Sequence, residues 1–181
     1  MAMEYNTDEK IIIVGHSYGG HVITSAANSI PNKIEKIIYI DAYITQNSDL
    51  DSDFYVKDFG FSGEITPTHY AIPPSWETYW SEPNSKGPKD VPHLAKTLQF
   101  PKELFQNQHE VAKIKGAYAL FTEGLDMNTP LEKQEFWQKA SYEKAIELGY
   151  FIQEKPWSHN AHRTDAKVFT SMLVELINNA S

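Results

Sequence analysis

Residues Ile11 to Gly20, with the sequence IIIVGHSYGG, place four aliphatic side chains in front of a serine and three glycines around it. A continuous aliphatic run favours a strand that is buried on both faces, as in a parallel sheet. The glycines permit a sharp turn, and the small residues that follow favour a helix. We therefore predict a buried strand, a tight turn at Ser17 and a helix, in that order.

The rest of the chain continues this alternation. A second apolar run, IEKIIYIDAY, follows the helical segment, which ends near Pro31, so that strand, helix and strand fit within about 30 residues, the size of a βαβ unit. Later segments predict a strand, a helix with Thr129 as N-cap and Gly149 as its end, another strand and a last helix (114–124, 129–149, 150–157 and 165–179). The fold class is α/β with a mostly parallel sheet.

A middle segment interrupts the pattern. Seven of the ten prolines fall between residues 45 and 112, together with the aromatic side chains Trp76, Tyr79 and Trp80. A long stretch without clear strands is typical of a functional lid or cap. We predict three parts: a core segment over 1–44, a cap insertion over 45–112, and the remainder of the core over 113–181.

Composition excludes several classes of function. The chain has no cysteine, so it forms neither disulfides nor thiolate metal sites, and its formal charge of -8 argues against nucleic acid and anionic membranes as partners. No apolar run approaches the roughly 20 residues of a membrane span, and the first ten residues lack a secretory pattern. The histidines lack metal-ligand spacing. We expect a soluble, cytoplasmic protein without metal or cofactor.

The residues around Ser17 form a G-x-S-x-G motif between a strand and a helix, the pattern of a nucleophile elbow. A serine hydroxyl attacks only when a base removes its proton, and it must stand clear of the backbone to reach a substrate. The turn that exposes it requires small neighbours, which Gly15 and Gly19 supply, and Gly20 lets the helix approach closely. The backbone N–H of Tyr18, at the helix start, can bind a developing oxyanion.

On these residues the sequence resembles the α/β-hydrolase superfamily. GHSYGG is similar to the fifth strand and elbow of that fold, and KIIYIDAY is similar to its sixth strand. The resemblance is greater to the branch of small esterases, plant methylesterases and hydroxynitrile lyases, since VPHLAKTLQFP, 91–101, is similar to a Pro-His segment in the cap of some members. It implies the C-terminal part of the fold, strands five to eight, with a cap insertion.

The resemblance implies a triad in the order serine, acid, histidine. The acid follows the seventh strand, where Asp126 lies past a glycine turn, and it is our first candidate. Asp41, at the end of the preceding strand, is the alternative that some members use, and Glu123 is a third.

The base is expected in the loop before the last helix, which contains His159 and His162. The family pattern places His159 in the catalytic position and His162 in a packing position. His159 would accept the Ser17 proton and return it to the leaving alcohol. His16, Trp76 and Trp80 are candidates for the substrate pocket.

The chain departs from the family in front of the elbow. The fold has four strands there, but only ten residues precede Ile11. We therefore expect the second oxyanion donor, which comes from the loop after the third strand, to be missing, at a cost on the order of 10² to 10³ in rate. We also expect KIIIVG to be an exposed sheet edge that pairs with a second copy or a complementing chain.

The leading hypothesis is a serine hydrolase that cleaves small apolar carboxylic esters without a cofactor. A hydroxynitrile lyase or a cofactor-free haloperoxidase would use the same triad, but a lyase of this branch would carry a lysine close to the acid, and none occurs between Glu123 and Lys133. A third alternative is an inactive, truncated hydrolase that acts as a binding or assembly module.

Overall fold

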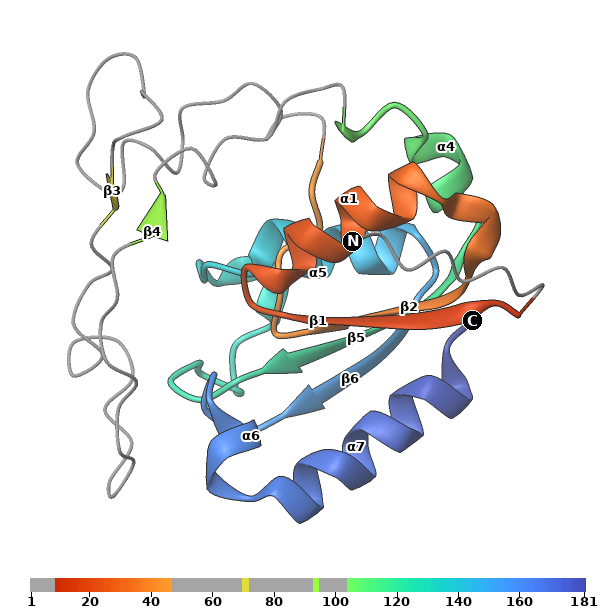
Figure 1. The fold of residues 1–181 in the computed structure, drawn as a ribbon. Coiled ribbons are helices and arrows are strands. Elements are labelled where there is room, and N and C mark those ends of the chain that lie inside the picture. Colours follow the sequence, from red (N-terminus) through yellow and green to blue (C-terminus); the bar gives the residue numbers. More distant parts are fainter. Residues whose placement is uncertain (1–8, 47–69, 72–92, 95–103) are drawn as a thin grey trace.

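The computed structural model describes residues 9–46, 70–71, 93–94 and 104–181, and it contains one four-stranded parallel sheet (Figure 1). The strand order is β1-β2-β5-β6, and every neighbouring pair is parallel. The strands are β1 (Ile11–His16), β2 (Ile34–Ile40), β5 (Lys115–Phe121) and β6 (Phe151–Lys155). The predicted α/β class with a parallel sheet is confirmed.

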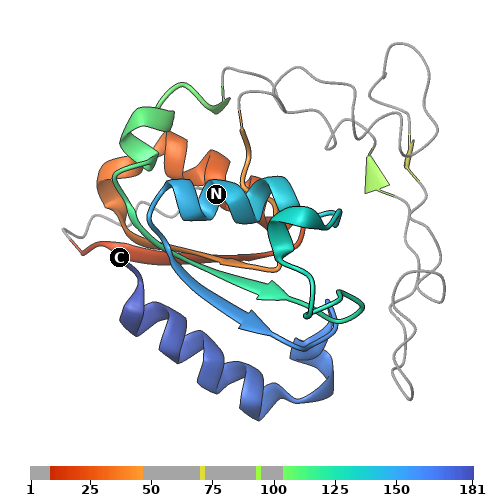
Figure 2. The same cartoon turned by 180° about the vertical axis from the view of Figure 1, so that it is seen from behind.

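Helices cover both faces of this sheet. The helices are α1 (Gly19–Ser29), α4 (Gln108–Val111), α5 (Lys139–Glu147), α6 (Ala161–Thr164) and α7 (Ala166–Asn179). Figures 1 and 2 show α1 and α5 on one face and α7 on the other. The carboxyl ends of the strands meet at one edge of the sheet, at the left in Figure 1, where the loops that follow them lie together.

Strand β2 shows why the sequence has a continuous apolar run. Its side chains alternate between the faces: Ile37 and Tyr39 pack on the side of α1 and α5, and Ile38 and Ile40 on the side of α7. All four residues are at most 1% exposed. A central strand with a helix layer on each side has no polar face, so periodic alternation is absent from its sequence.

The helix predicted over 129–149 is shorter in the structure. A 3₁₀ turn at Leu131–Lys133 is followed by irregular chain, and α5 begins only at Lys139. The predicted end is correct, because Gly149 adopts a positive φ of 71° just after the helix. Two glutamines of the interrupted segment make tertiary contacts instead: the side-chain amides of Gln134 and Gln138 donate to the Asp126 carbonyl and to Asp41, in two different loops of the sheet edge.

Strand β1 is an edge of the sheet within the described residues. Ile11, Ile12 and Val14 are 46%, 38% and 41% exposed, whereas Ile13 packs against the buried cluster beneath α1. An apolar strand with an open backbone edge is the kind of surface that pairs with another chain. The pairing itself stays a prediction.

Most of the predicted cap, 45–112, lies outside the described residues, and so do Trp76 and Trp80. From that segment the structure describes a short antiparallel pair, β3 (Tyr70–Ala71) with β4 (His93–Leu94), besides its ends.

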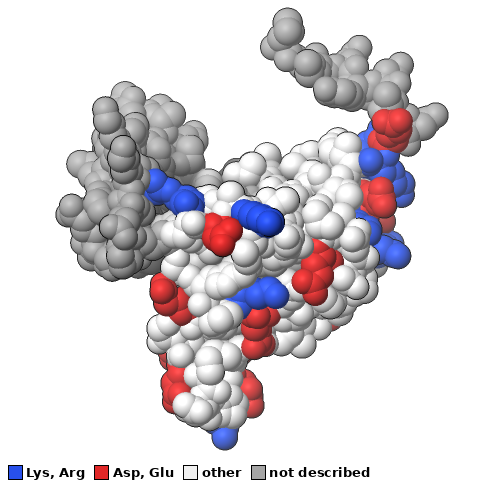
Figure 3. All heavy atoms as spheres, turned by 90° about the horizontal axis from the view of Figure 1, so that it is seen from below, with Lys and Arg blue, Asp and Glu red and all other residues white. Residues whose placement is uncertain are grey.

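The surface charges of the described residues are mixed. On the face shown in Figure 3, acidic and basic side chains are interspersed and neither sign forms a continuous patch. None of the helices in the described part of the chain is both long enough and apolar enough to span a membrane.

Candidate active site

Ser17 lies in a tight turn between β1 and α1. Its φ is 56°, in the left-handed region that a non-glycine residue rarely adopts. Neighbouring backbone maintains this conformation: the Ser17 N–H donates to the Ile40 carbonyl at 3.2 Å, and the Ser17 carbonyl accepts from the N–H groups of Gly20 and Tyr43 at 3.0 and 3.2 Å. The geometry is that of the predicted elbow, and it ties Ser17 to the chain that follows β2.

The glycines of the motif have unequal roles. A Cβ at Gly15 would lie 2.6 Å from the Gly19 carbonyl oxygen, and a Cβ at Gly20 would lie 1.9 Å from the carbonyl oxygen of Tyr43. At Gly19 a Cβ would meet nothing within 4 Å, so the expectation that Gly19 must be small is wrong. The turn needs glycine at 15 and 20, because other backbone passes directly over those positions.

Asp41 follows β2 and is buried beneath the sheet edge. Its side chain is 1% exposed, and its φ of 42° is also left-handed. One carboxylate oxygen, Oδ1, accepts hydrogen bonds from the backbone N–H of Phe121 at 3.0 Å and from Nε2 of Gln138 at 2.6 Å. A buried carboxylate requires such donors, because it has lost its hydration.

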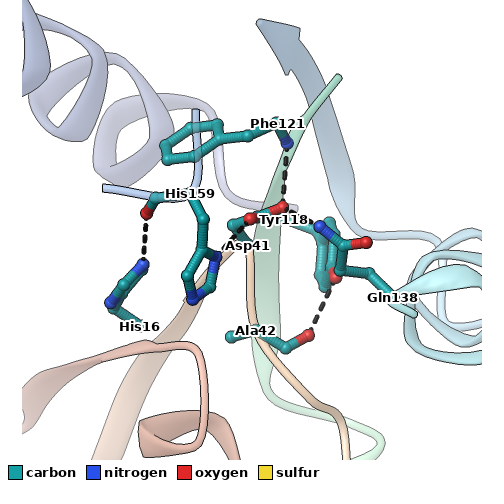
Figure 4. A network of polar contacts seen from close by, with 7 residues as sticks. All are labelled: His16, Asp41, Ala42, Tyr118, Phe121, Gln138 and His159. Atoms are coloured by element: carbon teal, nitrogen blue, oxygen red, sulfur yellow. Dashed lines mark hydrogen bonds and ion pairs between the residues drawn. The ribbon is translucent and has the colours of Figure 1, made fainter. Parts of the chain in front are cut away.

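The other oxygen of Asp41 contacts the histidine loop. His159 Nδ1 lies 2.5 Å from Asp41 Oδ2, and the His159 side chain is only 14% exposed (Figure 4). Because an ionised carboxylate can only accept, Nδ1 carries the proton and its N–H donates this hydrogen bond to Asp41 Oδ2. This bond joins positions 118 residues apart in the chain.

Asp126, the first candidate for the acid, lies in a different environment. It is exposed, and its carboxylate accepts from the backbone N–H and side-chain amide of Asn128 and from the hydroxyl of Thr129. These hydrogen bonds hold the pKa of Asp126 below its usual value. The structure therefore pairs His159 with Asp41, the alternative acid, and leaves Asp126 as the carboxylate that orders its own loop. Glu123 is also exposed.

Ser17 and Asp41 share one more property. Among the described residues, they are the only non-glycine positions with a positive φ. Such backbone strain costs about 1 to 3 kcal/mol at each position and concentrates at functional sites. Both strained residues lie at the carboxyl ends of adjacent strands, where His16 pairs with Ile40 in the β1–β2 register.

His16 supports the histidine loop. Its Nε2 lies 2.8 Å from the His159 carbonyl oxygen, and its ring lies 4.4 Å from the His159 ring and 4.8 Å from the His162 ring. Burial, followed by the neighbouring His159, lowers the pKa of His16 to about 4. A neutral His16 therefore donates Nε2–H to this carbonyl. His162 also contacts Phe169 of α7, in agreement with its predicted packing position.

Two aromatic residues at the site were not found from the sequence. The Trp137 ring lies 5.0 Å from the His159 ring at an interplanar angle of 86°, and 4.8 Å from the ring of Tyr43. Trp137 falls inside the segment that the sequence predicts as helix, where an aromatic residue reads as a packing position. The role of its neighbour Gln138 was not predicted either, because that role depends on a hydrogen bond to Asp41 that the local sequence does not indicate.

Tyr18 is the N-cap residue of α1, so its backbone lies at the positive end of that helix. Its role as an oxyanion donor stays a prediction. In the part of the chain that the structure describes, no group of three or more His, Asp or Glu side chains is arranged to hold a metal ion.

Several solved structures share this architecture. A tomato methylketone synthase I covers 98% of this chain at a TM-score of 0.63 and 18% identity, and a pyrethroid hydrolase from Sphingobium faniae covers 96% at 0.62 and 16%. A methylesterase from Arabidopsis covers 97% at 0.53 and 19%. This chain spans 74%, 72% and 72% of those proteins, respectively.

A curated protein is similar over a shorter segment. A carbendazim hydrolyzing esterase from a Nocardioides strain is 46% identical over 41 residues, which are 23% of this chain and 17% of the esterase. The sequence matches no known family model. The structural likeness shows that this chain has the α/β-hydrolase fold over about three quarters of its neighbours' length.

Proposed function

We propose that the chain carries the catalytic triad of a serine hydrolase for small apolar carboxylic esters, with Ser17 as nucleophile, His159 as base and Asp41 as acid. One observation carries the proposal. The imidazole of His159 is hydrogen-bonded to a buried, strained aspartate at the same sheet edge as a strained serine. Strained backbone of this kind concentrates at functional sites, where the surrounding structure holds it in place.

The proposed chemistry follows from the direction of the His159–Asp41 bond. With Nδ1–H donating a hydrogen bond to Asp41, Nε2 is the nitrogen that accepts a proton from the Ser17 hydroxyl as it attacks the ester carbonyl. The carbonyl oxygen then becomes an oxyanion, to which the Tyr18 N–H donates. His159 returns the proton to the leaving alcohol, and water releases the acid in a second round of the same steps.

Asp41 stabilises the imidazolium that forms in each round. Two donors on Oδ1 fix the plane of the carboxylate, so that Oδ2 faces His159 without rotation. Preorganisation of this kind lowers the barrier because no reorientation is needed when charge develops.

The similar proteins support an ester substrate. The names of the similar proteins include a pyrethroid hydrolase, a methylesterase and a carbendazim hydrolyzing esterase, and the last is the one with appreciable sequence identity. The match to the esterase is short, and the sequence identities to the other two proteins are low. We therefore propose carboxylic esters as the substrate class, and not the particular compound that any of these names mentions.

Labelling with a fluorophosphonate tests the nucleophile directly. The wild-type chain should become labelled in a time-dependent manner, and Ser17→Ala should not. Ser29→Ala is the matched control, because Ser29 is exposed at the far end of α1 and bonds only within the helix. Equal labelling of wild type and Ser17→Ala would refute the proposed nucleophile. A panel of nitrophenyl esters and mandelonitrile separates ester hydrolysis from cyanohydrin cleavage.

A further inference from the structure

Four aromatic rings form a continuous row from helix α1 to the proposed base. His21 stacks on Tyr43 with centroids 4.9 Å apart and an interplanar angle of 14°, Tyr43 contacts Trp137 at 4.8 Å, and Trp137 contacts His159 at 5.0 Å. The row joins α1, the loop after β2, the segment before α5 and the histidine loop. Segments far apart in the sequence thus place a wall of rings beside the catalytic imidazole.

Both ends of this row are fixed. His21 is 2% exposed, and its Nδ1 lies 2.8 Å from the Thr45 hydroxyl. At the other end, His159 is hydrogen-bonded to Asp41. Gln138 also bonds to Asp41, at 2.6 Å, and this bond fixes the backbone next to Trp137. A ring held in this way needs little reordering when a ligand binds, so most of the contact energy becomes affinity.

Trp137 is exposed despite these contacts. Its residue surface is 44% exposed, and Tyr43 beside it is half-buried. A large aromatic surface left open next to a base is suited to a flat apolar group, because offset stacking and edge-to-face contacts add to simple burial.

We propose that Trp137 and Tyr43 form the subsite that binds an aromatic ring of the substrate, either in its acyl or in its alcohol part, next to His159. The inference rests on the proposed ester hydrolysis for its kinetic consequence, but ring binding itself does not depend on turnover. The preferred substrate class is then the aryl-containing ester rather than the aliphatic ester of equal size.

Two pairs of esters test the subsite. Methyl phenylacetate and methyl cyclohexylacetate differ in the acyl ring, and benzyl acetate and cyclohexylmethyl acetate differ in the alcohol ring. In wild type the ratio of kcat/KM, aromatic over saturated, should be high for at least one pair. In Trp137→Leu that ratio should fall about 3- to 10-fold, and in Trp137→Phe it should largely recover.

The ratio of kcat/KM values within a pair separates ring binding from any effect of Trp137 on His159. An effect on the base lowers kcat/KM equally for the aromatic and the saturated ester and leaves their ratio unchanged. If Trp137→Leu lowers all four rates and leaves both ratios unchanged, the subsite is refuted. Ile146→Ala is the control, since Ile146 is 53% exposed on α5 and should leave both ratios unchanged.

A binding measurement keeps the two proposals distinguishable. The indole N–H resonance of Trp137, identified by its loss in Trp137→Phe, should shift saturably with benzyl alcohol and much less with cyclohexylmethanol. If no ester is hydrolysed but this selective shift occurs, ester hydrolysis fails and the subsite stands. Equal shifts with both alcohols would refute the subsite whatever the activity.

Discussion

The loop after β2 and the loop after β5 each contain an aspartate, but they use it in opposite ways. Asp41 is buried and strained, and it is bonded to three groups from distant parts of the chain, Phe121, Gln138 and His159. Asp126 is exposed, and the partners of its carboxylate, Asn128 and Thr129, lie two and three residues away. One carboxylate organises a site, and the other organises its own turn.

This difference between the two aspartates shows that the position of a carboxylate after a strand is not enough to identify a catalytic acid. Both aspartates follow buried strands at the same edge of the sheet, and the sequence favours the second. What distinguishes them is the number of distant donors that each one satisfies. A buried carboxylate with long-range partners is costly to keep and points to function, whereas a self-capped turn does not.

The largest expected effect compares the two aspartates in catalysis. Asp41→Asn should lower kcat for the best ester on the order of 10³- to 10⁴-fold, because an amide favours the wrong tautomer of His159. Asp126→Asn should stay within about threefold of wild type, because its carboxylate has only loop partners. Steady-state kinetics checks both, with circular dichroism to show that the variants are folded. A larger loss of kcat in Asp126→Asn than in Asp41→Asn would show that Asp126, and not Asp41, is the acid.

The second effect is the dependence of stability on pH. Burial lowers the pKa of both His16 and His21 from 6.5 to about 4. Between these values the unfolded chain binds more protons than the folded one, so the free energy of unfolding should fall as the pH drops from 6.5 towards 4, by up to about 1.4 kcal/mol per pH unit for each histidine.

Urea unfolding at several pH values measures this slope. His21→Asn should flatten it, because one of the two groups no longer titrates. His109→Asn is the control, since His109 is exposed at 84% of its side chain and should leave the slope unchanged. A stability that does not change between pH 6.5 and 4.5 would contradict the burial of these rings.

The smallest expected effect compares two glutamines that each hold one of the aspartate loops. Gln138→Met removes the 2.6 Å bond to the buried carboxylate of Asp41 and should lower the free energy of unfolding by about 1.5 to 3 kcal/mol. Gln134→Met removes the bonds that Gln134 makes to the Asp126 loop, which is exposed, and should cost less than about 1 kcal/mol.

Chemical denaturation of both glutamine variants measures the contrast, and ester kinetics sharpens it. Only Gln138→Met should also lower kcat, because only Gln138 orients a member of the proposed triad. Equal losses of stability and activity for the two variants would show that the two loops are supported alike.

The sequence by itself determined the strand, the turn and the helix around Ser17, the second strand, and the loop that carries His159. These features depend on local causes: an aliphatic run that must be buried, glycines where other backbone passes close by, and caps that end helices. Local patterns of this kind survive folding because neighbouring residues enforce them.

Tertiary structure alone decided which acid His159 meets, and that Trp137 stands beside it. The donors to Asp41 come from residues 80, 97 and 118 positions away, so their convergence is invisible in any local window. In the interrupted part of the helix predicted over 129–149, Gln134 and Gln138 likewise bond to loops that are distant or lie outside the helical pattern. A buried charge takes the partners that the packed chain brings to it, and only the complete fold specifies those partners.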